Sequence, residues 1–264
     1  MGVSMATART WVERWERQQE RYAVDREERF TVIADIVEHV VVGRADPLLL
    51  DLGCGPGSLA ARLAARFPYA EIVAADMDPV LLELGRTHHA DAARYVDTVV
   101  GADGWTDALQ LDRPLDAAVS TTALHYLAEP VLLRTYRALA SLLRPGGVLV
   151  NGDHFPPDAA ACSELTAHVG RRRSERLGGH ACEDWRSWWD AAARDPELTD
   201  LLDERRRRHA LHGGGDERIT VGRHAALLRR AGFAHVAPVW QFGDSAVLVA
   251  VMGGTGGPSA PVGT

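Results

Sequence analysis

The chain has 264 residues, 46% of them hydrophobic and 25% charged, a composition typical of a globular protein with room for one domain and an elaboration. A formal net charge of -7 argues against general affinity for nucleic-acid phosphates, and no apolar run is long enough to span a membrane. The three cysteines fit neither a disulfide framework nor a metal site, and nothing resembles a signal peptide. We therefore expect a cytoplasmic protein with no metal, no nucleic-acid partner and no membrane partner.

The first 45 residues are predicted to form a helical cap. Trp11 and Trp15 lie one helical turn apart, and apolar residues recur with a 3.6-residue period from Phe30 to Val40. The segment between these two patterns is polar and carries Tyr22 and Arg29. We expect two helices between residues 9 and 42.

The stretch 48–65, LLLDLGCGPGSLAARLAA, organises the rest of the chain. Its leucine run is typical of a strand buried on both faces. Gly53, Gly55 and Gly57 follow at a spacing suited to a tight turn with positive φ, and Ser58 is predicted to cap a helix. The unit is a strand, a glycine loop and a helix at the start of an α/β sheet.

The charge of this unit indicates which ligand it binds. A dinucleotide site spaces its glycines as GxGxxG, whereas Ser58 stands at the third glycine position here. Asp51, at the strand end, would repel phosphates but attract an ammonium or sulfonium group. These features favour a ligand that brings positive charge and no phosphoryl group.

The letters DLGCGPG resemble the first motif of class I S-adenosylmethionine-dependent methyltransferases. The resemblance implies S-adenosyl-L-methionine as cofactor and S-adenosyl-L-homocysteine as product, bound by Asp51 and the three loop glycines. It also implies an N-terminal helix over the cofactor. Tyr22 would then lie near the methyl-bearing sulfur and Arg29 near the carboxylate of the methionine moiety, although a surface role for Arg29 stays open.

The second strand is predicted at 71–76 and ends in Asp76. The resemblance implies that Asp76 accepts hydrogen bonds from both ribose hydroxyls, which suit one ionised carboxylate with two acceptor oxygens. It also implies that Met77 packs against the adenine. Asp78, directly before Pro79, is predicted to cap the next helix.

A third strand is predicted at 95–100. The resemblance implies that Asp103, just beyond it, accepts from the adenine amine. Trp105 either covers the adenine or fills the edge of the sheet, and the sequence leaves both interpretations open.

A fourth strand, 115–120, ends at Ser120, which we place at the cofactor. His125 lies just past this strand and is a candidate general base, the alternative being a histidine that holds its own loop. A helix at 131–143 and the letters LRPGGVLV, also typical of the family, lead into a fifth strand at 148–152. His154, at its end, is a second candidate base.

Residues 154–219 are predicted to be a helical insertion that binds the methyl acceptor, with helices at 158–177, 184–194 and 197–212. Trp185, Trp188 and Trp189 share one helical face and form either an acceptor pocket or ordinary core. The run 205–208 consists of four arginines among acidic residues, which favours a solvated helix face.

The chain then returns to the sheet. A helix at 221–231 is predicted to end at Gly232, and strands at 233–242 and 246–252 form a hairpin. The tail 253–264 has the composition of a flexible linker.

These elements predict an α/β fold: a Rossmann-like, seven-stranded class I methyltransferase sheet with helices on both faces. Residues 46–153 and 220–252 would form the cofactor-binding domain. The function we expect is methyl transfer to O, N or C of a small molecule of the specialised-metabolite class. A tRNA or protein methyltransferase, and a non-methylating S-adenosylmethionine-binding protein, are the alternatives. The oligomeric state is not readable from the sequence.

Overall fold

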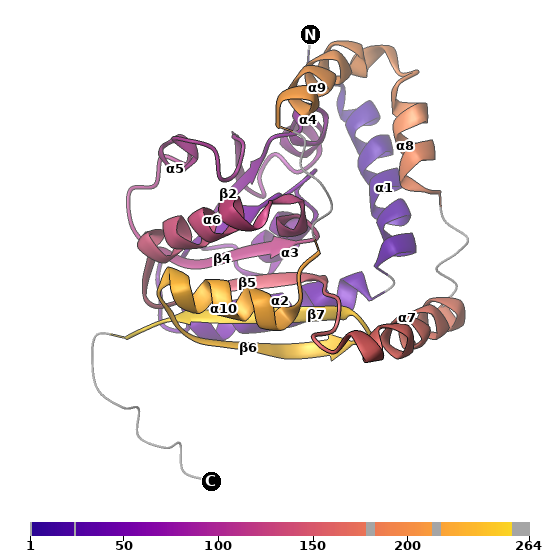
Figure 1. Ribbon diagram of the computed structural model, residues 1–264. Helices are drawn as coiled ribbons and strands as arrows, with labels where there is room; N and C mark the ends of the chain where they lie inside the picture. The colour runs from indigo at the N-terminus through magenta and orange to yellow at the C-terminus, as the bar shows by residue number, and fades with distance from the viewer. Residues whose placement is uncertain (1, 24, 178–182, 213–217, 255–264) are drawn as a thin grey trace.

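The computed structural model describes residues 2–23, 25–177, 183–212 and 218–254. At its centre is a seven-stranded sheet in the order β3-β2-β1-β4-β5-β7-β6 (Figure 1). The strands are β1 (Leu48–Leu52), β2 (Glu71–Asp76), β3 (Arg94–Asp97), β4 (Leu115–Thr121), β5 (Leu143–His154), β6 (Phe233–Phe242) and β7 (Ser245–Met252). The pairings among β1 to β5 are parallel, whereas β7 is antiparallel to both β5 and β6. The predicted fold class is confirmed.

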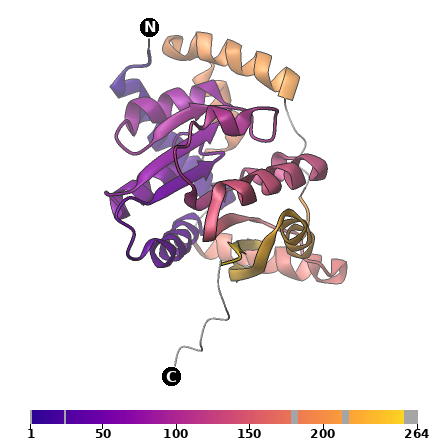
Figure 2. The ribbon, with the colours of Figure 1, turned by 90° about the vertical axis from the view of Figure 1, so that its left-hand side faces the viewer.

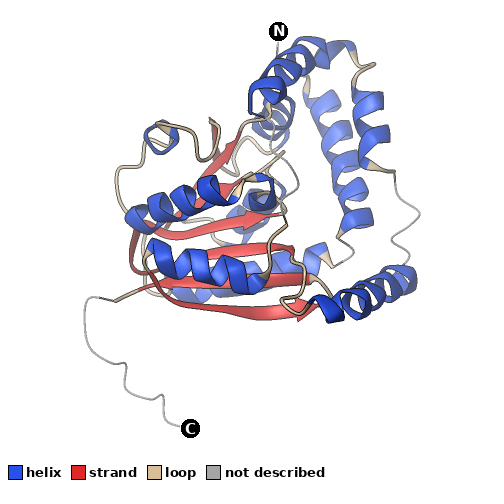
Figure 3. Cartoon of the chain, in the orientation of Figure 1, coloured by secondary structure: helices blue, strands red, loops and turns tan. Residues whose placement is uncertain are grey.

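Helices cover both faces of the sheet (Figures 2 and 3). One face packs against α5 (Trp105–Ala108), α6 (Glu129–Leu142) and α10 (Val221–Ala231), and the other against α2 (Arg26–Val41) and α3 (Ser58–Arg66). The strand pleat sends Leu50 and Leu52 into the first core and Leu49 into the second. The leucine run of β1 is therefore buried on both faces, as predicted.

A third core joins the N-terminal helix to the insertion. It lies between α1 (Met5–Tyr22), α4 (Pro79–His88), α8 (Trp185–Ala192) and α9 (Thr199–His212). These helices stand together at one end of the sheet, while α7 (Ser163–Leu177) lies near the β6–β7 turn (Figure 1). Short 3-10 turns complete the chain: η1 (Leu124–Tyr126), η2 (Ala160–Cys162) and η4 (Pro196–Leu198).

Most predicted element positions are confirmed, with local differences. Strand β3 ends at Asp97, three residues early, because the backbone N–H of Thr98 makes the last bond to β2, at the Asp76 carbonyl (2.9 Å). The first insertion helix begins at Ser163 rather than 158, after the 3-10 turn η2. Residues 255–264 of the predicted tail lie outside the described residues. Within the described ranges, no helix is both long and apolar enough to cross a bilayer.

The tryptophans of the insertion are mainly core. Trp188 is fully buried, with its ring edge-to-face against Trp11 (5.3 Å between centroids), Trp15 (5.2 Å) and Trp189 (4.7 Å). Trp185 is 44% exposed. Of the two interpretations, acceptor pocket or core, the structure therefore favours core for Trp188, whose ring packs α8 against α1.

Replacing Trp188 by alanine should destabilise the protein by about 3–5 kcal/mol, because a fully buried aromatic ring leaves a cavity. The exposed Trp185→Ala is the matched control and should cost less than about 1 kcal/mol. Urea denaturation followed by circular dichroism measures both. Equal losses for the two variants would contradict the packing described here.

Candidate functional site

The glycine loop after β1 is shaped by contacts that only glycine allows. Gly53 has φ +66°, and a Cβ placed there would lie 2.2 Å from the Cβ of Ala123. Gly57 has φ +83° and caps α3, in place of the predicted Ser58. A Cβ on Gly57 would lie 2.1 Å from the hydroxyl of Tyr95. The loop therefore brings its backbone close to the ends of β3 and β4.

Two carboxylates lie beside this loop, the buried Asp51 and the partly buried Asp76. Asp76 accepts from the backbone N–H of Gly55 (2.8 Å) and of Asp78 (2.9 Å). Asp51 is 2% exposed, and its Oδ2 has no hydrogen-bond partner among the described residues. No described cation forms an ion pair with either acid, so this negative charge is uncompensated.

Burial is the main reason that both acids hold their protons tightly. It raises the pKa of Asp51 to about 7, with the charge of Asp76 adding to the rise and a backbone N–H bond from Ala60 opposing it. Burial likewise raises the pKa of Asp76 to about 6, against the backbone N–H bonds from Asp78 and Gly55. The pair is arranged for a ligand that supplies positive charge and hydroxyl donors.

The N-terminal helix reaches this loop through Glu16, a residue that the sequence did not single out. Its carboxylate accepts from the Ser58 hydroxyl and pairs with Arg26 (2.5 Å) and Arg62 (3.0 Å). Burial opposes ionisation of Glu16, but Arg26, Ser58 and Arg62 together lower its pKa to about 2. The start of α3 is therefore tied to α1 and α2, which explains why Ser58 is not the helix cap.

His125 meets a buried acid from the next strand. Its Nδ1 lies 2.9 Å from one carboxylate oxygen of Asp153 and 3.0 Å from the other. Burial would raise the pKa of Asp153, but the hydrogen bond and charge of His125 outweigh it and lower the pKa. The ionised carboxylate is only an acceptor, so Nδ1 must donate. The lone pair of Nε2 is then the proton-accepting site of the ring.

His154 is placed less favourably for proton transfer. Its Nε2 lies 3.2 Å from the Arg29 guanidinium, which can only donate, and its Nδ1 lies 3.4 Å from Asp244. Arg29 itself is 1% exposed and donates to Ser245 (2.6 Å). Its other partners are the carbonyl of Gly152 on β5 (3.4 Å) and the carboxylate of Asp25, directly before α2 (3.5 Å). None of the contacts that the structure describes for Arg29 is with the glycine loop.

The other predicted cofactor residues are dispersed around the site. The hydroxyl of Tyr22, a half-exposed residue, accepts from the backbone N–H of Trp185 (2.9 Å). Asp103 is exposed. Trp105 is buried in the core under α6, which favours its sheet-filling interpretation. Ser120 is buried and donates to the carbonyl of Leu52 (2.8 Å), joining β4 to β1.

The arginine run departs from its predicted solvated face. Arg205 donates to Asp78 (2.6 Å), and Arg208 donates to the carbonyl of Met77 (3.1 Å). Arg206 and Arg207 pair with acids of their own helix, and Arg208 pairs with Glu204 of the helix (2.7 Å) in addition to its contacts outside it. The prediction was wrong for half of the run, because helical spacing turns the first and last arginines toward β2 and α4.

Gln18 is a further residue that the sequence did not single out. It is fully buried on α1, and both polar atoms of its side-chain amide lack a hydrogen-bond partner in the described part of the chain. It follows Trp11 by two helical turns and precedes Tyr22 by one, on the face that contacts α8. The only sequence signal was a glutamine in register with these two aromatic residues.

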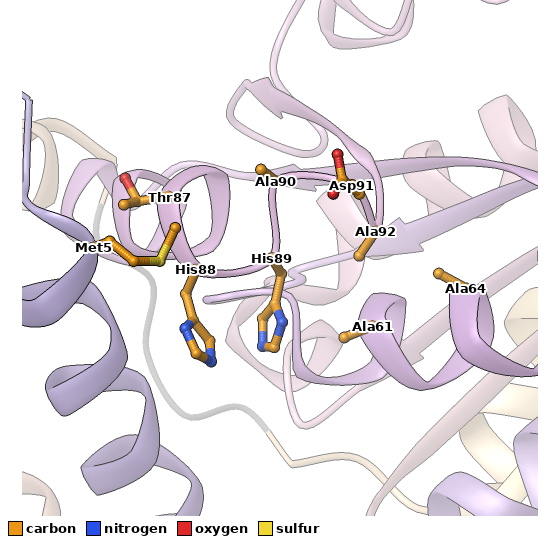
Figure 4. A pocket seen from close by; sticks show the side chains of 9 residues that line it. All are labelled: Met5, Ala61, Ala64, Thr87, His88, His89, Ala90, Asp91 and Ala92. Carbon is orange, nitrogen blue, oxygen red and sulfur yellow. The ribbon is translucent and has the colours of Figure 1, made fainter.

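A separate hollow of about 380 Å³ lies between the start of α1, α3 and the end of α4 (Figure 4). Its lining includes His88, His89 and Asp91. The ten residues of α4 place this end roughly 15 Å from the helix start near Asp76, so the hollow is distinct from the carboxylate pair. Among the described residues no group of three His, Cys, Asp or Glu side chains could hold a metal ion.

Comparisons with known proteins agree with this geometry. Residues 49–147 match the model of a methyltransferase domain family. Residues 49–147 form a class I, S-adenosylmethionine-dependent methyltransferase domain. The methyltransferase domain covers the glycine loop, both carboxylates and His125.

The relatives are themselves methyltransferases. Trans-aconitate 2-methyltransferase of Streptomyces coelicolor is 33% identical over 181 residues, covering 66% of this chain and 55% of that protein. Its counterpart in Methylobacterium radiotolerans is 36% identical over 123 residues, covering 47% and 44%. The chain thus spans about half the length of these curated relatives.

Solved structures confirm the fold. An O-methyltransferase family protein from Burkholderia thailandensis superposes with a TM-score of 0.56 at 19% identity, covering 91% of this chain and 60% of that one. The DszA carbon methyltransferase gives 0.55 at 15% identity, covering 87% and 55%. Their similarity extends beyond the methyltransferase domain to most of the chain.

The residues of the methyltransferase domain fit S-adenosylmethionine. The unpartnered Oδ2 of Asp51 and the lack of any described cation at Asp51 and Asp76 suit its cationic groups. Asp76 offers two acceptor oxygens to the vicinal ribose hydroxyls. The same carboxylates would repel the pyrophosphate of a dinucleotide.

Asp51→Asn should stabilise the ligand-free protein at pH 8. Because the folded state raises the pKa of Asp51 to about 7, its contribution to stability is present below pH 4 and is lost as the pH rises through 7. Denaturation at pH 5 and at pH 8 gives the free energy of unfolding at each pH. From pH 5 to pH 8 this free energy should fall by roughly 1–3 kcal/mol more in the wild type than in the variant. A loss of the same size in both proteins would contradict the assignment.

Proposed function

We propose that this protein transfers a methyl group from S-adenosylmethionine to a small-molecule acceptor. The observation that carries the proposal is the carboxylate pair beside the glycine loop, the buried Asp51 and the partly buried Asp76, which form no ion pair with a cation among the described residues. The matched methyltransferase domain supports methyl transfer. The net charge of -7 argues against an RNA substrate, whose phosphates such a protein would repel.

The chain contributes binding, orientation and proton transfer. Asp51 would neutralise the amino-acid end of the cofactor, and Asp76 would hold its ribose. When bound, the cofactor supplies an electrophilic methyl group that needs little further activation. Helices α1 and α9 contact the loops beside this site, and holding reactants in line there lowers the barrier by several kcal/mol.

The His125–Asp153 pair favours an acceptor that loses a proton on methylation, such as a phenol or alcohol. Asp153 orients the ring and would stabilise the imidazolium that forms when Nε2 takes the proton. The relatives are named for a different class of methyl acceptor, because trans-aconitate is a carboxylic acid. A carboxylate is already deprotonated and needs no base, so the two acceptor classes make different demands on His125.

The cofactor assignment is tested by calorimetric titration with S-adenosylhomocysteine. Wild type should bind it, NAD⁺ should fail to compete, and Asp76→Ala should weaken binding at least tenfold, since charge-assisted bonds to the ribose are lost. Asp91→Ala, exposed at the far end of α4, is the control and should bind like wild type. Binding of NAD⁺ in preference would refute the proposed function.

The role of His125 is tested with radiolabelled S-adenosylmethionine and a panel of phenols, alcohols and carboxylic acids. With a hydroxyl acceptor, His125→Ala should lower turnover by roughly 10²–10⁴. The exposed His235→Ala on β6 serves as control and should leave turnover unchanged. A His125→Ala rate within threefold of wild type would reduce His125 to a structural residue and favour the carboxylate class.

A further inference from the structure

The four arginines of α9 are divided by the helix into an inward and an outward pair. Arg205 and Arg208 are three residues apart and share one face. Their side chains are 16% and 25% exposed, whereas those of Arg206 and Arg207 are 67% and 66% exposed. One short segment thus contains two pairs of identical composition in different surroundings.

The inward pair contacts the loop between β2 and α4. Arg205 donates through Nε to Oδ2 of Asp78 (2.6 Å), and its guanidinium lies 3.7 Å from the ring centroid of Trp189. Arg208 donates to the carbonyl oxygen of Met77 (3.1 Å) and to the carboxylate of Asp97. The two arginines therefore hold the backbone and a side chain of one loop, and also reach the end of β3.

This loop contains the acid that we assign to the cofactor. The backbone N–H of Asp78 donates to Oδ1 of Asp76 (2.9 Å), and the N–H of Gly55 donates to Oδ2 (2.8 Å). A continuous series of hydrogen bonds thus runs from Arg205 through Asp78 and Asp76 to the glycine loop. Asp78 also accepts from the backbone N–H of Val80 (3.0 Å) at the start of α4, which fixes its position.

In the described part of the chain the outward pair forms no hydrogen bond or ion pair with this loop, although Arg207 shares its partner Glu204 with Arg208. Arg206 pairs with Asp203 (2.7 Å) and Arg207 with Glu204 (2.7 Å), both within α9. Exposed pairs of this kind contribute little to stability because solvent screens them. They leave the β2–α4 loop untouched.

We propose that Arg205 and Arg208 are positioning residues for the cofactor, so that helix α9 of the insertion completes the cofactor site. The inference rests on the proposed function, because it takes Asp76 as the ribose ligand. By holding Met77 and Asp78, the two arginines keep the Asp76 carboxylate in its binding position. Cofactor binding and α9 docking must then stabilise each other by the same factor.

The test compares two double variants of the full chain. Arg205→Ala/Arg208→Ala and Arg206→Ala/Arg207→Ala remove the same side chains and the same charge from the same helix. Calorimetric titration with S-adenosylhomocysteine should show binding roughly 5–150-fold weaker for the inward variant, the range of typical couplings between two sites. The outward variant should bind within twofold of wild type.

Hydrogen–deuterium exchange separates positioning from general loss of structure. In wild type, S-adenosylhomocysteine should slow amide exchange in residues 199–210, and this protection should vanish in the inward variant while β1 and β4 stay protected. Arg205→Lys/Arg208→Lys keeps the charges and should recover part of the affinity, and it also serves as the test protein if the alanine pair does not fold.

Three results would overturn the inference while leaving the proposed function intact. The first is wild-type affinity in the inward variant, or in the lysine variant if only that one folds. The second is exchange in α9 that does not respond to ligand in the wild type. The third is equal weakening in the outward variant, since bulk charge would then be the cause. A wild type that fails to bind S-adenosylhomocysteine would instead remove the proposed function itself.

Discussion

The arrangement of the site depends on two carboxylates at the carboxyl ends of β1 and β2, the buried Asp51 and the partly buried Asp76. Removing an ionised carboxylate from water is costly, and this is the main reason that the pKa values of Asp51 and Asp76 are raised; the charge of Asp76 adds to the rise at Asp51, and that of Asp78 to the rise at Asp76. The sheet sustains this cost because large apolar cores on both faces hold the strand ends in place. A cationic ligand with hydroxyl groups lowers the cost of ionising these acids, so the unpaired carboxylates favour such a ligand over one that carries phosphates.

Both ion pairs and apolar contacts join the helices that cover this site to the rest of the protein. Glu16 ties α1 and α2 to the start of α3, and Arg205 and Arg208 tie α9 to the loop after β2. The tryptophan core between α1 and α8 connects the N-terminal region to the insertion. The N-terminal helix and the insertion, which are distant in sequence, are therefore joined to each other, and they contact neighbouring parts of the site.

The candidate site was predictable where neighbouring residues encode it. The strand, the positive-φ glycines and the acid at the strand end lie within one short stretch, and each has a local physical requirement. His125 was also found from its place after β4. Its partner Asp153, 28 residues further along, had been noticed at a strand end, but nothing in the sequence indicated that the two side chains meet.

The sequence by itself determined the seven-stranded α/β sheet, the order of its elements and the ligand charge that its first loop accepts, because periodicity, turn chemistry and charge are properties of adjacent residues. Only the tertiary structure decided that Arg29 is engaged at β5 and β7, that Gln18 is buried with no hydrogen-bond partner among the described residues, and that two of four consecutive arginines hold the loop after β2. Such pairings depend on how distant helices are rotated and docked, and local sequence patterns carry little information about that.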